Sequence, residues 1–472
     1  MERHRTLQAT VAWSYDLLDD TEKLVFQRLS TLAGSFDLEA AEAIAAGGAV
    51  EGFEVLDALG HLVDKSMVLT VTAASGGRYR LLETLRQYVA DRLAEQADAT
   101  EVQARHARFW CDRAVTLGRA TGGADQHSVL DAIDADLDNY RTAFAHLLAT
   151  GNVNDAARGV QALTAYWQIR RTREGLRWQQ ALLGHADLDA HRRIRALAAS
   201  ARAEVLIGDE NAAERPALDA VALAEAAGVD PPYAACEALM HTATRRQDPV
   251  TYRRWWERAH HVAVAGGGRY LQLLVDTQFG LVAGAWDSAE AIAHHERLHD
   301  EVRRHGDPLL VFNAAHIFSM VLYDAGDSER ARAMAHAAIE PGRRAGPLTH
   351  TVALRHAAEL DTLTGDTDPA RVALAEAIRV ARDEGLTPHV FCGVDVAAAL
   401  AARRHDPETA AVLLAAAARH AGSGVQSSAH HACRIEARTA LDALAGDLTA
   451  AQRHGENMTI DELCDYTLAS LT

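Results

Sequence analysis

The chain has 472 residues, enough for two to four domains of ordinary size, and its 49% hydrophobic and 24% charged residues are typical of a folded protein. Its formal net charge of −18 argues against a general binder of nucleic acid or anionic membranes, because both attract a positive surface. With apolar runs far shorter than the ~20 residues of a membrane span and no apolar signal region after Met1, we expect a cytoplasmic protein without membrane contact.

The first hundred residues carry helical periodicity, then a short β-rich stretch, then helical periodicity again. Apolar residues at three-to-four spacing, with Asp20-Thr21 and Asp37 as candidate caps, predict four successive helices. Two short strands around a small-residue turn then indicate a β-hairpin, and this order describes a winged-helix domain over residues 1–117. The predicted elements are helices 6–18, 21–32, 38–46 and 53–63, strands 67–72 and 78–82, and helices 83–96 and 101–118.

The charge of this segment argues against direct DNA binding. Residues 1–116 hold 12 Lys and Arg against 18 Asp and Glu, a net charge of −6. A DNA-reading domain normally presents a basic face to the phosphates. We therefore interpret the winged helix as a domain that packs against protein.

A period of about forty residues runs through positions 186–455. Turn-like aspartates recur at intervals of 39 to 41 residues, and glycines recur 19 residues after each of the first five. Two turn signals in each period, with alanine-rich amphipathic segments between them, predict helix–turn–helix pairs in which aspartate caps the second helix and glycine ends it. The aspartates are Asp209, Asp248, Asp287, Asp327, Asp366, Asp406 and Asp447, and the glycines are Gly228, Gly267, Gly306, Gly346, Gly385 and Gly422.

The predicted fold class is therefore mainly α: a winged-helix domain with a small β-hairpin, followed by an α-solenoid that resembles tetratricopeptide (TPR) repeats. Solenoids of this kind bind along a concave face and rarely catalyse. The predicted domains are the winged helix at 1–117, a helical connector at 118–185, the solenoid at 186–455 and a C-terminal helix at 456–472.

Several sequence motifs resemble the part that follows the nucleotide-binding domain in bacterial STAND-type ATPase regulators of the LuxR-like and AfsR-like family. They occur in the family's order over most of the chain. The resemblance implies a winged helix and a TPR-like sensor that restrain and release an ATPase controlling transcription. The motifs lie at Leu7–Leu18, Phe26–Ser30, Leu62–Ser66, Arg78–Tyr88, Asp136–Arg141, Tyr166–Trp178 and Glu456–Glu462.

Two departures from that family concern nucleotide. The NTPase domain that the resemblance implies before this segment is missing, and the chain has only two lysines, Lys23 and Lys65, neither in the Gly-Lys-Ser/Thr context of a P-loop. Relatives that carry a Met-His-Asp motif use its histidine to contact nucleotide, and Leu82 takes that place here. We expect no cofactor and no enzymatic activity, with a P-loop NTPase in trans as one implied partner.

Histidine-rich strings offer a competing interpretation as metal chemistry. His295-Glu296-Arg297-Leu298-His299 matches the HExxH pattern of zinc proteases, but 24 histidines make a chance match common, and charged neighbours favour a solvated helix face. The adjacent pairs His260-His261 and His430-His431 diverge by ~100° on a helix, so we expect surface histidines and no metal site.

The repeat alignment predicts a binding surface. Eleven residues before the aspartates, the first helices carry polar side chains, whereas one position earlier the residues are apolar or small. The polar register continues through His241 and Met320. In TPR-like solenoids the first helices line the groove, so the hypothesis is an effector or peptide site centred on His316 and Arg355; the alternative is an ordinary solvated stripe. The predicted site residues are Glu237, Asp276, His316, Arg355 and Asp395.

The preferred function is thus a non-catalytic regulatory module that senses a protein or small molecule in the solenoid groove. The alternative is the regulatory part of an ATPase or nucleotide-cyclase system whose catalytic domain lies on another chain. Mixed charges in the predicted groove suit a polar or zwitterionic ligand better than lipid or nucleic acid.

Overall fold

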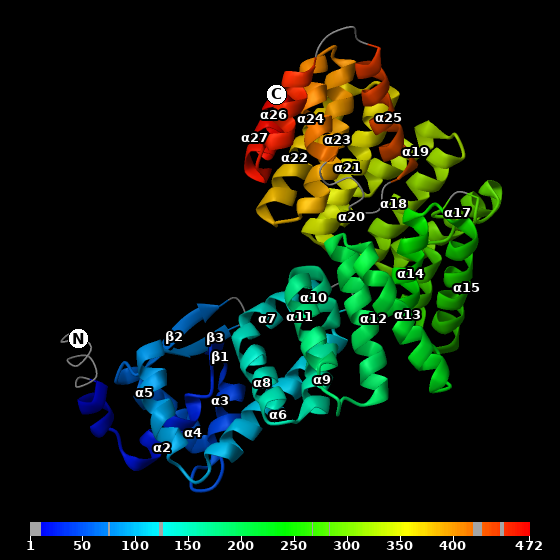
Figure 1. Cartoon of the computed structure of the whole chain (residues 1–472). Helices are drawn as coiled ribbons and strands as arrows, with labels where there is room; N and C mark the ends of the chain where they lie inside the picture. The colour runs from blue at the N-terminus through cyan, green and yellow to red at the C-terminus, as the bar shows by residue number, and fades with distance from the viewer. Residues whose placement is uncertain are drawn as a thin grey trace. The chain divides into compact units, whose positions relative to one another are not determined.

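The computed structural model describes residues 11–73, 76–121, 126–266, 268–282, 284–418, 427–443 and 448–472. It is mainly helical with one small sheet (Figure 1), which confirms the predicted fold class. Two compact units are present: unit 1 contains residues up to Arg170 together with Ala181–Arg192, and unit 2 contains Arg171–Gln180 and Arg193–Thr472. Over the described ranges, no helix combines the length and apolar character needed to cross a bilayer.

Unit 1 begins with the winged helix. Residues 11–16 are helical, while the start of the predicted first helix, 6–10, lies outside the described residues. Asp19 and Glu22 form a reciprocal capping box at the start of the next helix, and Asp37 caps the one after it. The elements are α2 Asp20–Leu29, β1 Ser35–Phe36, α3 Leu38–Ala45, α4 Gly52–Asp64, β2 Val68–Ala73, β3 Gly76–Leu81, α5 Glu83–Ala94 and α6 Ala99–Arg119.

The sheet has the antiparallel order β1-β3-β2. The sequence predicts β2 and β3 but treats Gly34–Asp37 as a simple helix break. Strand β1 is two residues long, pairing Ser35 with Arg80 and Phe36 with Tyr79, and is too short to show an alternating pattern.

The first four connector helices belong to unit 1, whereas most of the fifth, α11, belongs to unit 2. The predicted boundary at 117 falls inside α6, which packs against α3 on one side and against α8 and α9 on the other. One helix therefore serves both the winged helix and the connector. The connector helices are α7 Gln126–Ala135, α8 Leu137–Ala149, α9 Val153–Ala162 and α10 Thr164–Arg170, followed by α11 Thr172–Leu183.

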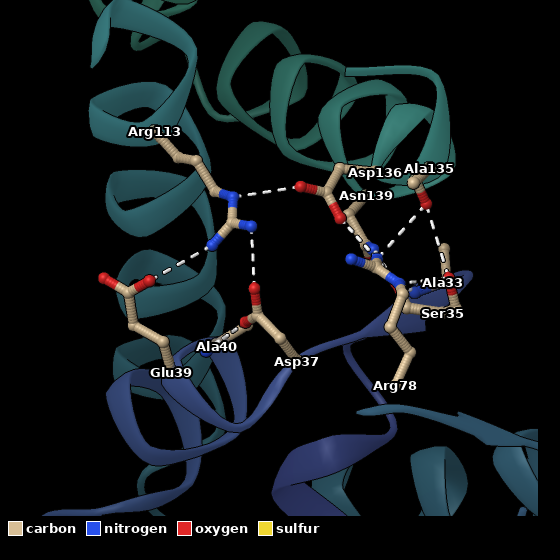
Figure 2. Close-up of polar contacts among 10 residues, drawn as sticks. All are labelled: Ala33, Ser35, Asp37, Glu39, Ala40, Arg78, Arg113, Ala135, Asp136 and Asn139. Carbon is tan, nitrogen blue, oxygen red and sulfur yellow. Dashed lines mark hydrogen bonds and ion pairs between the residues drawn. The ribbon is translucent and has the colours of Figure 1, made fainter. Parts of the chain in front are cut away.

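A buried carboxylate joins these parts of unit 1, as Figure 2 shows. Asp136, which is 1% exposed, accepts from Arg78 of β3 through Oδ1 and lies 2.9 Å from Nε of Arg113 of α6 through Oδ2. Arg113 also pairs with Asp37, the cap of α3, at 2.7 Å. Asn139 accepts from the amide of Ala33 at 2.9 Å. Because a buried carboxylate requires compensating charge, Asp136 holds the two arginines in place, which gives this motif a structural role.

Unit 2 is a succession of helix pairs that lie side by side in chain order, from green to red in Figure 1. The first members are α12 Ala190–Ile207, α14 Tyr233–Arg245, α16 Gly268–Asp276, α18 Pro308–Asp324, α21 Pro347–Thr364 and α23 Thr387–Arg403. The second members are α13 Glu210–Ala226, α15 Pro249–Gly266, α17 Ser288–His305, α19 Ser328–Ala337 with α20 Ile339–Ala345, α22 Thr367–Asp383 and α24 Pro407–Ala418.

The joint between the two helices of a pair has a repeated backbone geometry. In five pairs the residue before the aspartate has a positive φ, and the aspartate amide donates 2.8–3.0 Å to the carbonyl five residues earlier. This is the Schellman arrangement, which satisfies the last carbonyls of one helix just before the next begins. The positive-φ residues are Gly208, Gln247, Gly326, Gly365 and His405.

The predicted caps are confirmed at most described positions. Asp209, Asp287 and Asp327 accept from amides of the following helix, as do Asp248 and Asp406. The exception is Asp366, whose carboxylate pairs with Arg332 instead. Gly228, Gly306 and Gly385 are left-handed as predicted, with φ of 69°, 78° and 66°, whereas Gly346, before Pro347, has a φ of 141°. Asp447, Gly267 and Gly422 lie outside the described residues.

The last helices depart from the simple period. Helix α25, Ser428–Asp442, packs against α18, α21 and α23, the first members of three earlier pairs, and α26, Thr449–Asn457, packs mainly against α24. Helix α25 thus lies against the first-helix side of the solenoid. Helix α27, Ile460–Ser470, closes the unit against α22, α23 and α24, and a capping box of Thr459 and Glu462 starts it.

The left-handed joints predict a stabilising substitution. His405 is exposed, has a φ of 60° and makes no hydrogen bond with its side chain among the described residues. A non-glycine residue in this conformation costs ~1–2 kcal/mol, partly offset by the entropy that glycine loses on folding. We expect His405→Gly to raise the free energy of unfolding by about 0.5–1 kcal/mol, measured by urea denaturation followed by circular dichroism. The matched control, His405→Ala, keeps the Cβ and is expected to give no gain; equal effects of the two substitutions would contradict the assignment.

Candidate ligand-binding site

Unit 2 contains a cavity of about 230 Å³ on the side of the first helices. Its wall is contributed by α12, α14, α18, α21 and α23, by the turn after α16 and by Ser427, the N-cap of α25. Most of the wall is apolar, and polar groups converge at a few places. The main apolar side chains are Leu206, Leu281, Leu309, Phe312, Ile317 and Val352.

Three of the five predicted site residues line this cavity: Glu237, His316 and Arg355. They come from the predicted position on α14, α18 and α21. His241 and Met320, from the continued polar register, also line it. The structure therefore brings together the predicted centre and its α14 neighbour, but not the two predicted flanking aspartates.

Asp276 lies outside the cavity because its helix ends there. Trp286, directly before Asp287, lacks the positive φ of the corresponding residue in the other pairs, and α16 stops at Asp276. The carboxylate pairs with His260 at 3.2 Å, and burial raises its pKa. Gln278, in the following turn, occupies the cavity wall instead. Asp276 therefore does not line this cavity.

Asp395 is also outside the cavity wall, because α25 covers its side of α23. Its Oδ2 lies 3.2 Å from Nε2 of His430, and its Oδ1 lies 3.5 Å from Nε of Arg434, both on α25. His389, earlier on α23, lines the cavity. The flanking role predicted for Asp395 is replaced by an interhelical contact.

One cluster of polar side chains in the cavity wall centres on Glu237. This side chain is 4% exposed and forms an ion pair with Arg202 of α12. Its Oε1 also accepts from Gln278 at 3.2 Å, and Gln278 donates to the hydroxyl of Tyr233 at 2.9 Å. The negative charge of Glu237 is therefore compensated by the protein itself.

The other polar group centres on Arg355, which is 4% exposed and pairs with the fully buried Glu359 through Nη1. Glu359 accepts from three further groups: His430 at 3.1 Å, His356 at 2.9 Å and Ser427 at 2.9 Å. Burial opposes ionisation of Glu359, but Arg355 and the two histidines outweigh it and hold its pKa well below the usual range.

His430 bridges two carboxylates, which fixes its protonation. Nδ1 faces Glu359 and Nε2 faces Asp395, and an ionised carboxylate only accepts hydrogen bonds, so both ring nitrogens donate. Burial lowers the pKa of His430, but the hydrogen bonds to Asp395 and Glu359 outweigh burial and raise it. The expectation of a surface histidine is wrong here: His430 is fully buried as a cation that ties α25 to α21 and α23.

The cavity histidines behave differently. Burial lowers the pKa of His241 to about 4 and that of His389 to about 3, with nearby Arg202 and Arg355 adding to the effect. Burial also holds the pKa of His316 well below its usual value, and its ring stacks on Phe312 at 5.3 Å. At neutral pH these three rings are therefore uncharged hydrogen-bonding groups beside two arginines.

Sequence reasoning missed six polar members of the wall: Arg202, Gln278, Asn313, Thr349, His389 and Ser427. Arg202 stands seven residues before Asp209, the same register as His241, so extending the alignment by one repeat would have found it. Gln278, His389 and Ser427 carry no such signal, because the early end of α16 and the packing of α25 place them there.

The HExxH string is not a metal site. His295 is 1% exposed, which corrects the expected solvated face; its Nε2 lies 2.8 Å from the carbonyl of Phe279 and its ring stacks on Phe318 at 5.3 Å. Glu296 pairs with Arg330 at the surface. A search of the described residues for three or more His, Cys, Asp or Glu able to share a metal ion found no such group.

Comparison with known proteins supports the winged helix first. The winged helix-turn-helix domain family matches residues 18–94. "Putative HTH-type transcriptional regulator Rv0890c" of Mycobacterium tuberculosis is 38% identical over 204 residues, which are 43% of this chain and 23% of that protein. "Uncharacterized protein Rv0894" of the same organism is 40% identical over 103 residues, 22% of this chain and 26% of that protein. The matched regions thus span about a quarter of these relatives.

A solved structure shares the fold over nearly the whole chain. The protein is the signal transduction ATPase with numerous domains (STAND) with a tetratricopeptide repeat sensor, PH0952, from Pyrococcus horikoshii. The TM-score is 0.52 at 15% identity, covering 97% of this chain and 66% of that chain. The order of a winged helix followed by a TPR-like solenoid is therefore an arrangement similar to that of a STAND protein with a repeat sensor.

Proposed function

We propose that this chain is the non-catalytic regulatory part of a STAND-type transcriptional regulator of the LuxR-like and AfsR-like kind. In this proposal the solenoid of unit 2 senses an effector, and the winged helix of unit 1 passes the state of the sensor to a P-loop NTPase domain outside these residues or in trans. A cytoplasmic location is part of the proposal.

The observation that carries this proposal is the cavity on the first-helix side of unit 2. It combines an apolar wall with convergent polar groups, the composition of small-ligand sites in general. Its volume of about 230 Å³ suits a small molecule or a single inserted side chain better than an extended peptide. The resemblance to regulators supplies the biological context.

The effector role is tested by filling the cavity. Asn313 lines it, is half-buried and has no hydrogen-bond partner for its side chain among the described residues, so Asn313→Trp should occupy the space without removing an interaction. We expect a crystallographic fragment screen to place ligands in the wild-type cavity and none there in Asn313→Trp.

The matched control for that screen is Asn211→Trp, at an exposed position of α13. It introduces the same side chain away from the cavity, so fragment occupancy should equal that of the wild type. Fragments that avoid the wild-type cavity altogether would contradict a sensing role for it.

The absence of a P-loop lysine predicts no nucleotide turnover by the purified chain. Lys65 follows Asp64 in sequence and pairs with Glu22 at 2.7 Å, and Leu82 stands where some relatives have a nucleotide-contacting histidine. We expect ATP hydrolysis at the rate of a protein-free blank and no ATP binding by calorimetry at millimolar nucleotide. Turnover that persists in Lys23→Ala/Lys65→Ala would contradict the non-catalytic assignment.

The second helix of the helix-turn-helix predicts weak DNA affinity. In such domains this helix enters the major groove, and here it is α4, whose outward side chains include Phe53, Leu56, Asp57 and Asp64. Carboxylates at that position repel phosphate. We expect fluorescence anisotropy with 30-base-pair duplexes at ~150 mM salt to give only weak, sequence-independent binding. A sub-micromolar, sequence-selective complex would overturn this part.

A further inference from the structure

The Arg355 end of the cavity contains an incompletely used cation. Of the three guanidinium nitrogens of Arg355, only Nη1 has hydrogen-bond partners among the described residues, and Nε is buried with none. The neighbouring carboxylate cannot supply the missing acceptors, because Glu359 already accepts from four side chains. Nη2 has no hydrogen-bond partner among the described residues and is not buried like Nε, so this end of the cavity favours a ligand that brings an acceptor for it.

The charges around Arg355 leave one positive charge uncompensated. The cluster around Glu359 contains Arg355, the doubly protonated His430 and the half-buried Arg434 as cations. Its anions are Glu359 and Asp395, so the cations exceed them by one even if His356 is neutral. That excess matches a single negative charge; a doubly charged phosphate would leave one charge unbalanced in a mainly apolar cavity.

The remaining wall at this end adds donors and no further carboxylate. His316 and His389 both line the cavity within electrostatic range of Arg355, and their rings are neutral. A neutral imidazole can donate one hydrogen bond to an anion, and a nearby anion also favours its protonation.

The Glu237 end disfavours a ligand ammonium. Glu237 is the one acidic side chain in the cavity wall, and it is engaged by Arg202 and Gln278. A zwitterionic ligand would have to displace Arg202 to place its own cation there. Between the two ends the wall is apolar, with Phe312, Ile317 and Val352 among its members.

From these contacts we propose that the cavity binds a small monocarboxylate with an apolar body, its carboxylate against Arg355, His316 and His389 and its body against the apolar wall. This inference rests on the proposed sensing function and specifies the chemical class of the effector. A carboxylate fits because it is a singly charged acceptor that can accept a charge-assisted hydrogen bond from the open Nη2 of Arg355 and further bonds from the neutral histidines.

The test uses three apolar skeletons, those of phenylacetate, 4-phenylbutyrate and octanoate. Each is tested as the acid, the primary amide and the primary amine. At pH 7.5 the three forms carry a charge of −1, 0 and +1 on nearly the same shape. We expect calorimetry and ligand-observed NMR on the full chain to show at least one acid binding about tenfold more tightly than its amide, and the amine more weakly still.

Variants locate the carboxylate. Arg355→Lys keeps the charge beside Glu359 but removes the planar fork, and we expect it to weaken the acid about tenfold. The control Arg246→Lys makes the same change in an exposed ion pair with Glu214 outside the cavity and should alter the affinity less than twofold. Thermal melting curves show whether each variant folds. If Arg355→Lys does not fold, His389→Phe provides a second variant at the same end of the cavity.

The outcomes separate this inference from the proposed function. An amide or amine that binds as tightly as its acid overturns the carboxylate assignment, as does the failure of all three acids to bind at 10 mM. Fragments seated in the wild-type cavity would leave the sensing role intact in either case. Acid binding that Asn313→Trp leaves unchanged would place the acid elsewhere and overturn the inference.

Discussion

The architecture of unit 2 depends on a two-residue joint, a left-handed residue followed by aspartate. The left-handed residue turns the chain out of the first helix, and the aspartate amide satisfies a carbonyl of the helix just ended. Its side chain usually caps the next helix. Because reversal takes so few residues, each pair is closely antiparallel and the first helices remain on one side. The cavity is lined mainly by these first helices.

Where the joint is missing, the geometry changes. Before Asp287 the left-handed residues are Gly280 and Gly284, not the residue next to the aspartate. Helix α16 ends at Asp276, and Gln278 and Leu281 come to the cavity wall from a turn. A turn can place side chains at positions that a continuous helix cannot. This turn therefore adds Gln278 and Leu281 to a wall that otherwise comes mainly from the first helices of the regular pairs.

The sequence determines more of this fold than of its site. The spacing of the aspartates predicts the helix pairs because turn chemistry is local. For the same reason the register eleven residues earlier selects Glu237, His316 and Arg355, which line one cavity. Asp276 and Asp395 fail because their surroundings are set by tertiary events: a helix that ends early and α25 packing against the first helices. His430 fails likewise, since nothing in a pair of adjacent histidines reveals two carboxylates on other helices. Strand β1 is too short to leave a pattern.

Arg355 has two roles: it lines the cavity, and it takes part in the ion cluster that holds α25 in place. A ligand bound to its guanidinium would change the electrostatic interactions of Arg355 with Glu359 and His430. A shift of α25 would in turn change the electrostatic potential at the ligand. Linkage makes the two effects equal in free energy, whichever is taken as the cause. If the cavity binds a ligand, its occupancy and the docking of α25 are reciprocal equilibria, coupled through Arg355 and through Ser427 at the start of α25.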